Sequence, residues 1–366
     1  MKRFNFKAEL GKMTPKIAEG AKLYIWGTGN NCERISRMFA RLVKADIYEY
    51  IDGFIDNDFD KQGTEFHGKR VYNISAIDPC SSVVLIAVDS HKANLDILKQ
   101  LMRIGMRELN SVFPVDWAFN LLMKFAYSMS MQFKDKHKDK RCFVIANGSS
   151  LSVNDLNMLK NEITFAVNKI FLIFDKTDWR PTYYICQEDL LFESIQDEIC
   201  REIHCDKFFS LPAVLELDEF KLTNSDYFYF QLDSSHRWRL DSKPGFSEDI
   251  ALIRSGESVI YTCIQFAAYM GFSEIYLLGA DNTMTPVVKL NGEIIRHNYD
   301  WLHFDSNYRP TDIYMPQIDV INAAYGTARE YADSHGIKIY NATRGGKLEA
   351  FERVNFDNLF EVEKCE

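Results

Sequence analysis

The stretch CFVIANGSSL at residues 142–151 decides the fold of the longer part of this chain. An unbroken apolar run, 142–146, passes directly into Asn147, Gly148 and Ser149. Short apolar runs bounded by turn residues are typical of strands buried on both faces, as in parallel sheets. Glycine permits a tight turn, and the N–H groups and hydroxyls that follow can hold an anion. We therefore predict a strand followed by an anion-binding turn; an ordinary turn with serine caps is the alternative.

Further predicted strands follow and alternate with helical patterns. The strands are 163–168, 183–189, 274–281 and 338–341, and the helical patterns are 257–270 and 316–334. Strands and helices in alternation give a parallel sheet with crossover helices. The carboxyl ends of parallel strands line one crevice, where ligands bind. We therefore expect Asn168, Gln187 and Asp189, which lie at strand ends, to bind the same ligand as Asn147.

The first third of the chain shows the same alternation. Its predicted strands are 23–26, 51–58 and 83–88, and its predicted helices are 33–43 and 91–103. The chain is therefore predicted to be an α/β protein of two Rossmann-like three-layer α/β/α domains with mostly parallel sheets. We place the first domain at 1–115, a helical linker at 116–140 and the second domain at 141–366.

A second candidate nucleotide site lies at the end of the first predicted strand. Gly27 and Gly29 form a loop that opens a helix. Asp56 ends the next strand, where a Rossmann site places the acid that binds a ribose. A full dinucleotide motif would have a third glycine at position 32, which is Cys32. The alternative is a structural or regulatory platform.

Two residues of the second domain are candidates for catalysis. Asp281 follows a strongly apolar strand and is expected to hold Mg²⁺ or a ligand hydroxyl, or else to cap the next turn. His303 lies in a polar, aromatic and irregular stretch, 298–310, of the kind that forms lids over active sites. Histidine suits proton transfer near neutral pH, so His303 is the candidate base. A structural histidine is the alternative.

Composition and charge exclude several function classes. The net charge of −9 argues against nonspecific nucleic-acid binding. The eight cysteines form no CxxC pair and no zinc-type spacing, so we expect buried reduced thiols. No signal peptide and no apolar stretch of membrane-spanning length are evident. We therefore expect a cytoplasmic protein; a peripheral position at the inner face of the membrane stays open.

Resemblance to a known family rests on four segments of the second domain. They are IANGSSL (145–151), AVN (166–168), RSGESVIYTCIQFAAYMGFSEIYLLGADN (254–282) and IYNATRGG (339–346). Together they resemble the 6-hydroxymethylpterin diphosphokinase MptE-like domain, which is similar to CMP-sialic-acid-dependent bacterial sialyltransferases and Maf flagellin glycosyltransferases. The first domain resembles the small Rossmann modules of bacterial polysaccharide-biosynthesis enzymes, through WGTGNNCERI (26–35) and GFIDND (53–58).

The resemblance implies roles for individual residues. The residues expected to contact the nucleotide are Asn147, Gly148, Ser149, Asn168, Gln187, Asp189, Ser255 and Gly256. His303 matches the general base of the sialyltransferases, and Gln187 stands where those enzymes have an asparagine. Their two phosphate-binding tyrosines have no counterpart after Asp281. If the chain is instead a diphosphokinase, ATP and Mg²⁺ occupy the crevice, with Asp281 and Asp189 as metal contacts.

Three functions stay open on this basis. The first is a glycosyltransferase of surface polysaccharide or glycoprotein biosynthesis. It would use a nucleotide-activated sugar, preferably a CMP-sugar, and a glycan or lipid-linked acceptor. The second is a Mg-ATP-dependent diphosphokinase of a pterin-like alcohol. The third is a non-catalytic nucleotide-sugar-binding protein. A homo-oligomer is also left open.

Overall fold

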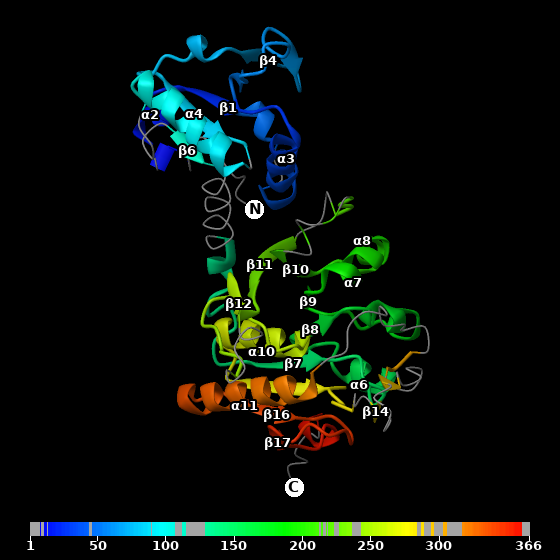
Figure 1. The fold of residues 1–366 in the computed structure, drawn as a ribbon. Helices are drawn as coiled ribbons and strands as arrows, with labels where there is room; N and C mark the ends of the chain where they lie inside the picture. Colours follow the sequence, from blue (N-terminus) through cyan, green and yellow to red (C-terminus); the bar gives the residue numbers. More distant parts are fainter. Residues whose placement is uncertain are drawn as a thin grey trace. The chain divides into compact units, whose positions relative to one another are not determined.

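The computed structural model describes two compact units, 1–128 and 129–366, each taken here by itself (Figure 1). The described residues are 8, 11–12, 14–43, 46–88, 90–106, 112–114, 129–211, 214, 217, 219–222, 227–235, 243–283, 287–288, 294–295, 303–305 and 317–360. Most of the predicted linker, 116–140, lies outside them, so its helical character stays a prediction. None of the described helices is long and apolar enough to cross a membrane.

The first unit is a six-stranded sheet in the order β3-β4-β2-β1-β5-β6. Its strands are β1 Lys22–Trp26, β2 Gly53–Ile55, β3 Glu65–Phe66, β4 Lys69–Tyr72, β5 Ser82–Ile86 and β6 Val112–Pro114, and its helices are α2 Pro15–Ala18, α3 Asn30–Val43, η1 Ile47–Glu49, η2 Ile74–Ala76 and α4 His91–Arg103. All neighbours are parallel except the β3–β4 hairpin. Strand β1 lies at the centre, and the chain changes direction in the sheet between β1 and β5.

The second unit is a nine-stranded sheet in the order β12-β11-β10-β9-β8-β7-β13-β16-β17, with every neighbouring pair parallel. Its strands are β7 Arg141–Ile145, β8 Thr164–Val167, β9 Tyr183–Cys186, β10 Asp206–Ser210, β11 Tyr227–Asp233, β12 Leu252–Arg254, β13 Glu274–Leu278, β16 Lys338–Asn341 and β17 Glu352–Arg353. A separate antiparallel pair is formed by β14 Val287–Val288 and β15 Ile294–Ile295. The predicted α/β class with mostly parallel sheets is confirmed.

Most helices of the second unit lie in the crossovers between its strands, whereas η3 precedes β7 and η7 follows β17. The helices are η3 Met131–Phe133, α6 Val153–Met158, η4 Ile170–Lys176, α7 Asp189–Ser194, α8 Gln196–Glu202, α10 Val259–Tyr269, α11 Ile318–His335 and η7 Asp357–Phe360. Helix α10 contacts β7, β8 and β9, and α11 packs beside it next to β16. Helix α10 is buried almost throughout. Its residues are mostly apolar on every face, as expected of a helix that is covered on all sides.

The order of the strands locates the topological switch point of the second unit. From β7 the chain moves outward through β8 to β12, and it then returns to the other side of β7 at β13. The switch point therefore lies between β7 and β13. In open α/β sheets, ligands bind outside the carboxyl ends of the strands at such a point. The loops that follow β7 and β13 are 146–151 and 279–282.

Several elements are shorter than their predicted ranges. Of the predicted strand 51–58, only β2, Gly53–Ile55, is formed. The strand ends there because Asp56 Oδ1 accepts a hydrogen bond from the Asp58 N–H (3.0 Å), which turns the chain. The predicted helix 257–270 begins later, at Val259, because Ser258 is its N-cap and accepts from the Ile260 N–H. Polar side chains that bond to nearby backbone end such elements early.

Candidate nucleotide-binding site

Asn147 lies at the carboxyl end of β7, and only one of its two side-chain amide atoms makes a hydrogen bond to a described residue. Its Nδ2 donates to the Val167 carbonyl (3.0 Å), which fixes the orientation of the amide. Its Oδ1 is buried and has no hydrogen-bond partner among the described residues. A buried acceptor without a partner costs about 1–3 kcal/mol. A ligand that donates a hydrogen bond to Oδ1 would recover this cost.

Asn168 repeats this arrangement on the neighbouring strand, β8. Its backbone has a positive φ of 51°, which is uncommon outside glycine. Tyr184 holds it there by donating its hydroxyl to the Asn168 carbonyl (2.7 Å). Its Oδ1 is also buried without a partner in the described part of the chain. Two adjacent strand ends therefore carry unpaired acceptors next to the switch point.

Gly148 allows the loop after β7 to lie directly against the loop after β13. Its N–H donates to the Gly279 carbonyl (3.0 Å). A Cβ at this position would collide with that carbonyl and would lie 2.6 Å from Asp281 Cγ. Gly148 does not have a positive φ, so backbone conformation does not require glycine here. Glycine is required because the two loops pack too closely to leave room for a Cβ.

Asp281 is buried and holds the loop that follows β7. Its carboxylate accepts from the Ser149 hydroxyl (3.2 Å), from the Ser150 N–H (3.1 Å) and from the Ser150 hydroxyl. Mg²⁺ would have to compete with these donors for the same oxygens. No three metal-ligating side chains gather among the residues that the structure describes. The observed contacts are those of a carboxylate that holds the loop, and the predicted role of Asp281 as a Mg²⁺ contact stays a prediction.

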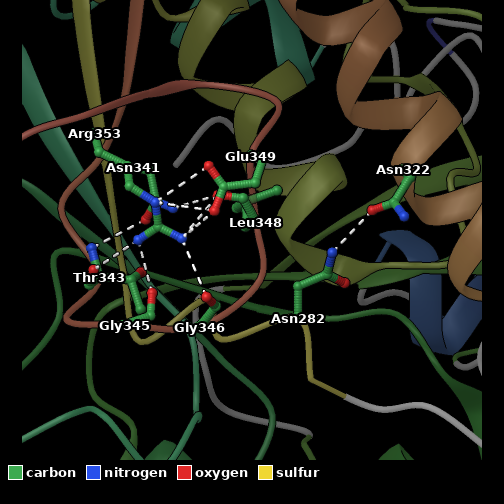
Figure 2. Close-up of polar contacts among 9 residues, drawn as sticks. All are labelled: Asn282, Asn322, Asn341, Thr343, Gly345, Gly346, Leu348, Glu349 and Arg353. Carbon is green, nitrogen blue, oxygen red and sulfur yellow. Dashed lines mark hydrogen bonds and ion pairs between the residues drawn. The ribbon is translucent and has the colours of Figure 1, made fainter.

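The loop between β16 and β17 supports Asp281, and Figure 2 shows how Arg353 of β17 holds this loop. The Arg353 guanidinium donates to the carbonyls of Gly345 (2.7 Å), Gly346 (3.2 Å) and Leu348 (3.3 Å). The Lys347 N–H of this loop donates to the Asp281 carbonyl (2.7 Å). Arginine suits such a role because its planar fork carries five donors.

Two further contacts tie the loops after β13 and β16 to their surroundings. The Ala280 N–H donates to Thr343 Oγ1 (3.1 Å). Asn282 has a positive φ of 50°, and its Nδ2 donates to Asn322 Oδ1 on α11 (2.8 Å; Figure 2). Strained residues such as Asn282 persist only where their surroundings hold them, and they cluster at functional sites.

His303 lies directly beside the loop after β7. It forms an antiparallel bridge with Gly148, and its Nδ1 lies 3.2 Å from the Asn147 carbonyl. The Phe304 N–H donates to the same carbonyl (3.2 Å), and Asp305 pairs with Lys176 (3.0 Å). A carbonyl can only accept, so Nδ1 carries the proton in the neutral ring and Nε2 is the basic nitrogen.

The surroundings of His303 keep its ring neutral. Burial is the largest influence and lowers the pKa of His303 below its usual value of 6.5. The Asn147 carbonyl and Asp281 act in the opposite direction, and the charge of Lys169 again lowers this pKa. Lys169 directly follows Asn168, and burial lowers its own pKa as well. A neutral imidazole is the form that can accept a proton.

Gln187 and Asp189 follow β9, the third strand from the switch point on this side. Gln187 is buried, and its Oε1 accepts from the Thr262 hydroxyl of α10 (2.7 Å). Its backbone carbonyl accepts from the Ser210 hydroxyl (2.5 Å). Asp189 begins α7, is half-buried, and uses Oδ1 to accept from the Leu190 N–H (2.9 Å).

Ser255 and Gly256 form a buried turn between β12 and α10. The Ser255 N–H donates to the Asp233 carbonyl (2.8 Å). A Cβ on Gly256 would collide with Tyr261 and would lie 2.6 Å from Ala324 Cβ. The helix begins three residues after Gly256, so these two residues precede its N-cap, Ser258.

Hydrogen bonds and close contacts connect one group of the predicted site residues directly. That group is Asn147, Gly148, Ser149, Asp281 and His303. Asn168 and Gln187 lie at the ends of the next two strands, whereas Ser255, Gly256 and Asp189 make their described contacts with other residues. Sequence reasoning missed Thr262 and Lys169. Only Lys169 carried a signal, because it directly follows a strand-end asparagine.

In the first unit, Asp56 holds the glycine loop. Its Oδ2 accepts from the Thr28 N–H (3.2 Å) and the Thr28 hydroxyl (2.6 Å). Burial raises the pKa of Asp56, but the hydrogen bonds from Thr28 and Asp58 and the charge of Lys61 outweigh burial. The pKa of this carboxyl group is therefore lower than its usual value. In the described structure this carboxylate contacts the loop, and its predicted role as a ribose ligand stays a prediction.

The two glycines of this loop differ in a way that can be tested. Gly27 has φ +110°, and a Cβ there would lie 3.0 Å from the Ala87 carbonyl oxygen, whereas a Cβ on Gly29 would meet open space. We expect Gly27→Ala to destabilise the first unit by about 1–3 kcal/mol, and Gly29→Ala to leave it nearly unchanged. Thermal unfolding of both variants measures the difference. Equal melting temperatures would contradict the described loop.

Two family models match the chain. Residues 119–286 match the family described as 6-hydroxymethylpterin diphosphokinase MptE-like, and residues 19–111 match the family described as C2185-like, N-terminal. No curated protein matches the chain in sequence.

Two solved structures are similar to this fold. One is a Maf glycosyltransferase from Magnetospirillum magneticum AMB-1, with 11% identity and a TM-score of 0.42, matched over 94% of this chain. This chain spans only 58% of the length of that protein. The other is the sialyltransferase CstII from Campylobacter jejuni, with 15% identity and a TM-score of 0.38, matched over 59% of this chain and 85% of that one. The predicted family resemblance of the second unit is confirmed by the family model: residues 119–286 form an MptE-like segment.

Proposed function

We propose that this chain is a transferase whose site lies at the carboxyl edge of the nine-stranded sheet. It binds a nucleotide-activated sugar there and transfers the sugar to a hydroxyl of a glycan or lipid-linked acceptor. The observation that carries the proposal is the contact of His303 Nδ1 with the Asn147 carbonyl (3.2 Å). This contact joins the His303 ring to the backbone of the same residue whose side-chain Oδ1 is buried and unpaired among the described residues, at the switch point.

The chemistry of the step requires such a base. An acceptor hydroxyl is a poor nucleophile, and the bond between the sugar and the nucleotide phosphate breaks as the new glycosidic bond forms. The hydroxyl proton goes to His303 Nε2, and the nucleotide leaves with the electrons of the broken bond. A base within hydrogen-bond reach contributes about 10²–10⁴-fold.

The strained backbone of the same edge supports this location. Asn168, Glu257 and Asn282 have positive φ values of 51°, 58° and 50°. Each follows a strand end of the sheet or precedes α10. Such conformations cost about 1–3 kcal/mol each and are retained where function requires them. A CMP-linked sugar is our preferred donor, on the resemblance of residues 147–149 and 168 to the sialyltransferases.

A diphosphokinase is the second candidate, because the family that matches residues 119–286 is described by that activity. Such an enzyme would transfer a diphosphate from ATP to an alcohol and release AMP. A non-catalytic module would bind a nucleotide sugar without turnover. Thermal-shift titration with CMP, UDP, GDP and ATP, each with and without Mg²⁺, separates these functions, because a ligand of the folded state raises the melting temperature. Stabilisation by ATP and Mg²⁺ alone, followed by AMP release, would replace the glycosyltransferase proposal.

Asn147 provides a direct test of the site. We expect Asn147→Ala to weaken nucleotide binding by about 1–3 kcal/mol, because a buried acceptor is lost. Asn157→Ala is the matched control, since exposed Asn157 on α6 makes one side-chain hydrogen bond, to Thr177 (2.8 Å). Calorimetric titration measures both variants. Unchanged affinity in Asn147→Ala would remove this residue from the site.

A further inference from the structure

We infer that the ion pair between Lys176 and Asp305 positions the proposed base, His303, by fixing segment 303–305 to η4. The two residues lie far apart in the sequence, and Lys176 Nζ donates to Asp305 Oδ2 (3.0 Å). The inference rests on the proposed function, because a positioning role requires a base to position. It assigns this role to two side chains that are not among the predicted site residues.

Two donors of segment 303–305 share one acceptor on the loop after β7. His303 Nδ1 and the Phe304 N–H each lie 3.2 Å from the Asn147 carbonyl oxygen. A carbonyl oxygen has two lone pairs and can accept both, although 3.2 Å is at the long end for such hydrogen bonds. Because both contacts meet at one atom, by themselves they do not prevent rotation of the segment about that atom. A contact at a distance from this atom limits the rotation.

Asp305 supplies such a contact two residues beyond His303. Its side chain is only 10% exposed, whereas the side chain of Lys176 is 49% exposed. A carboxylate that is largely removed from water attracts a nearby cation more strongly than an exposed one does, because the effective dielectric constant is lower. The hydrogen bond to Asp305, and then the charge of Asp305, raise the pKa of Lys176. The pair therefore holds segment 303–305 more firmly than a pair of exposed side chains would.

Lys176 is the last residue of η4, and η4 is itself fixed on the second unit. Its buried side chains are Ile170, Phe171, Ile173 and Phe174. The Arg180 guanidinium donates to the carbonyls of Phe174 (3.4 Å) and Thr177 (2.8 Å), and it lies over the Phe174 ring. Helix η4 begins two residues after Asn168, at the end of β8. The ion pair therefore joins segment 303–305 to the crossover that starts at this strand end.

The position of a base decides its rate. A base must lie within hydrogen-bond reach of the proton that it takes, and a misplacement by about 1 Å can cost about 10²-fold. Loss of the ion pair should therefore lower the rate of transfer. Nucleotide affinity should change little, because the Asn147 side chain is oriented by the Val167 carbonyl (3.0 Å) and not by segment 303–305.

Two substitutions of Lys176 change the charge in steps. Lys176→Met removes the charge and keeps a side chain of similar length, whereas Lys176→Glu places a second carboxylate against Asp305. We expect kcat to fall by about tenfold in Lys176→Met and further in Lys176→Glu, with the dissociation constant of CMP changed by about twofold at most. Release of CMP from CMP-sialic acid measures kcat, and calorimetric titration measures the affinity for CMP.

Lys160 provides the matched control. Its Nζ lies 3.4 Å from Asp178, whose side chain is 97% exposed, and neither residue has a described contact with segment 303–305. Lys160→Met and Lys160→Glu make the same changes of charge and size. They should leave both kcat and the affinity for CMP unchanged, because an exposed pair contributes little.

Hydrogen exchange of the Phe304 amide tests the ion pair without any ligand or turnover. The Phe304 N–H is bonded to the Asn147 carbonyl while segment 303–305 is in place. We expect this amide to exchange about tenfold faster in Lys176→Met than in the natural chain, and at an unchanged rate in Lys160→Met. Sodium chloride at about 1 M should speed the exchange in the natural chain but not in Lys176→Met, because salt screens the attraction between charges.

Failure of the positioning role and failure of the proposed function give different results. Equal exchange of the Phe304 amide in the natural chain, Lys176→Met and Lys176→Glu would overturn the positioning role and leave the proposed function in place. A loss of CMP affinity with unchanged kcat would overturn it as well. If exchange responds as expected but the natural chain leaves CMP-, UDP- and GDP-sugars intact, the proposed function fails, and the ion pair then holds a segment that carries no base.

Discussion

Replacement of His303 by alanine is expected to lower turnover by about 10²–10⁴-fold and to leave nucleotide affinity nearly unchanged. A base acts in the transition state and not on the bound donor, so the loss should appear in kcat and not in the dissociation constant of the nucleotide. Steady-state kinetics and calorimetric titration of the same preparation measure the two quantities. Normal turnover in His303→Ala would end its assignment as the base.

The pH dependence follows from the burial of His303. Because burial lowers its pKa below 6.5, the ring is neutral at pH 7 and Nε2 can accept a proton. The rate should therefore stay constant through neutral pH and fall only as the pH drops through this lowered pKa. A rate that already declines between pH 8 and pH 7 would contradict the described environment.

Two variants separate proton transfer from positioning. The amide of His303→Asn keeps an N–H donor for the Asn147 carbonyl but takes up no proton near neutral pH. It should therefore be as slow as His303→Ala while retaining the contact. His204→Ala is the matched control, because His204 is exposed and follows α8. Recovery of turnover in His303→Asn would show that the ring only positions the loop.

Replacement of Gly148 by alanine should destabilise the second unit by about 3 kcal/mol or more, because the added Cβ would collide with the Gly279 carbonyl and Asp281. Both loops are held by backbone hydrogen bonds, so neither can move away without losing one. The matched control is Gly326→Ala in the middle of α11, where a Cβ meets open space. That substitution should stabilise the helix by roughly 0.5–1 kcal/mol.

Calorimetric unfolding of the full chain measures both glycine variants. The chain has two compact units, so the transition of the second unit has to be resolved from that of the first. We expect the second transition to move down in Gly148→Ala and slightly up in Gly326→Ala. A Gly148→Ala variant with an unchanged melting temperature would contradict the close approach of the two loops.

The central strands could be predicted from the sequence because their signal is local. Strands β7 and β13 are buried and largely apolar after their first, charged residue, and parallel strands buried on both faces favour this pattern. Strands β12 and β17 could not be predicted, since Leu252–Arg254 and Glu352–Arg353 are short and partly or fully exposed. Their pairing depends on neighbours that are distant in the sequence.

The site could be predicted in part. Asn147 and Asn168 stand at strand ends, where the sheet topology alone brings them near the switch point. The loop-holding contacts of Asp281 could not be foreseen, because Ser150 lies 131 positions earlier in the chain. Thr262 gave no signal either, since a hydroxyl inside an apolar helix has no visible partner until the helix is packed on Gln187.

The support that Arg353 gives to the loop after β16 has a consequence for synthesis on the ribosome. The Asp281 carbonyl is bonded by Lys347, and the Ala280 N–H by Thr343, so the crevice is bordered by residues that are translated well after strands β7 to β13. A nascent chain that has exposed only these strands has Ser149 and Ser150 to hold the Asp281 carboxylate, but it lacks Thr343 and Lys347, which hold the backbone of residues 280 and 281. We therefore expect the proposed nucleotide binding to begin only after residue 353 has left the exit tunnel.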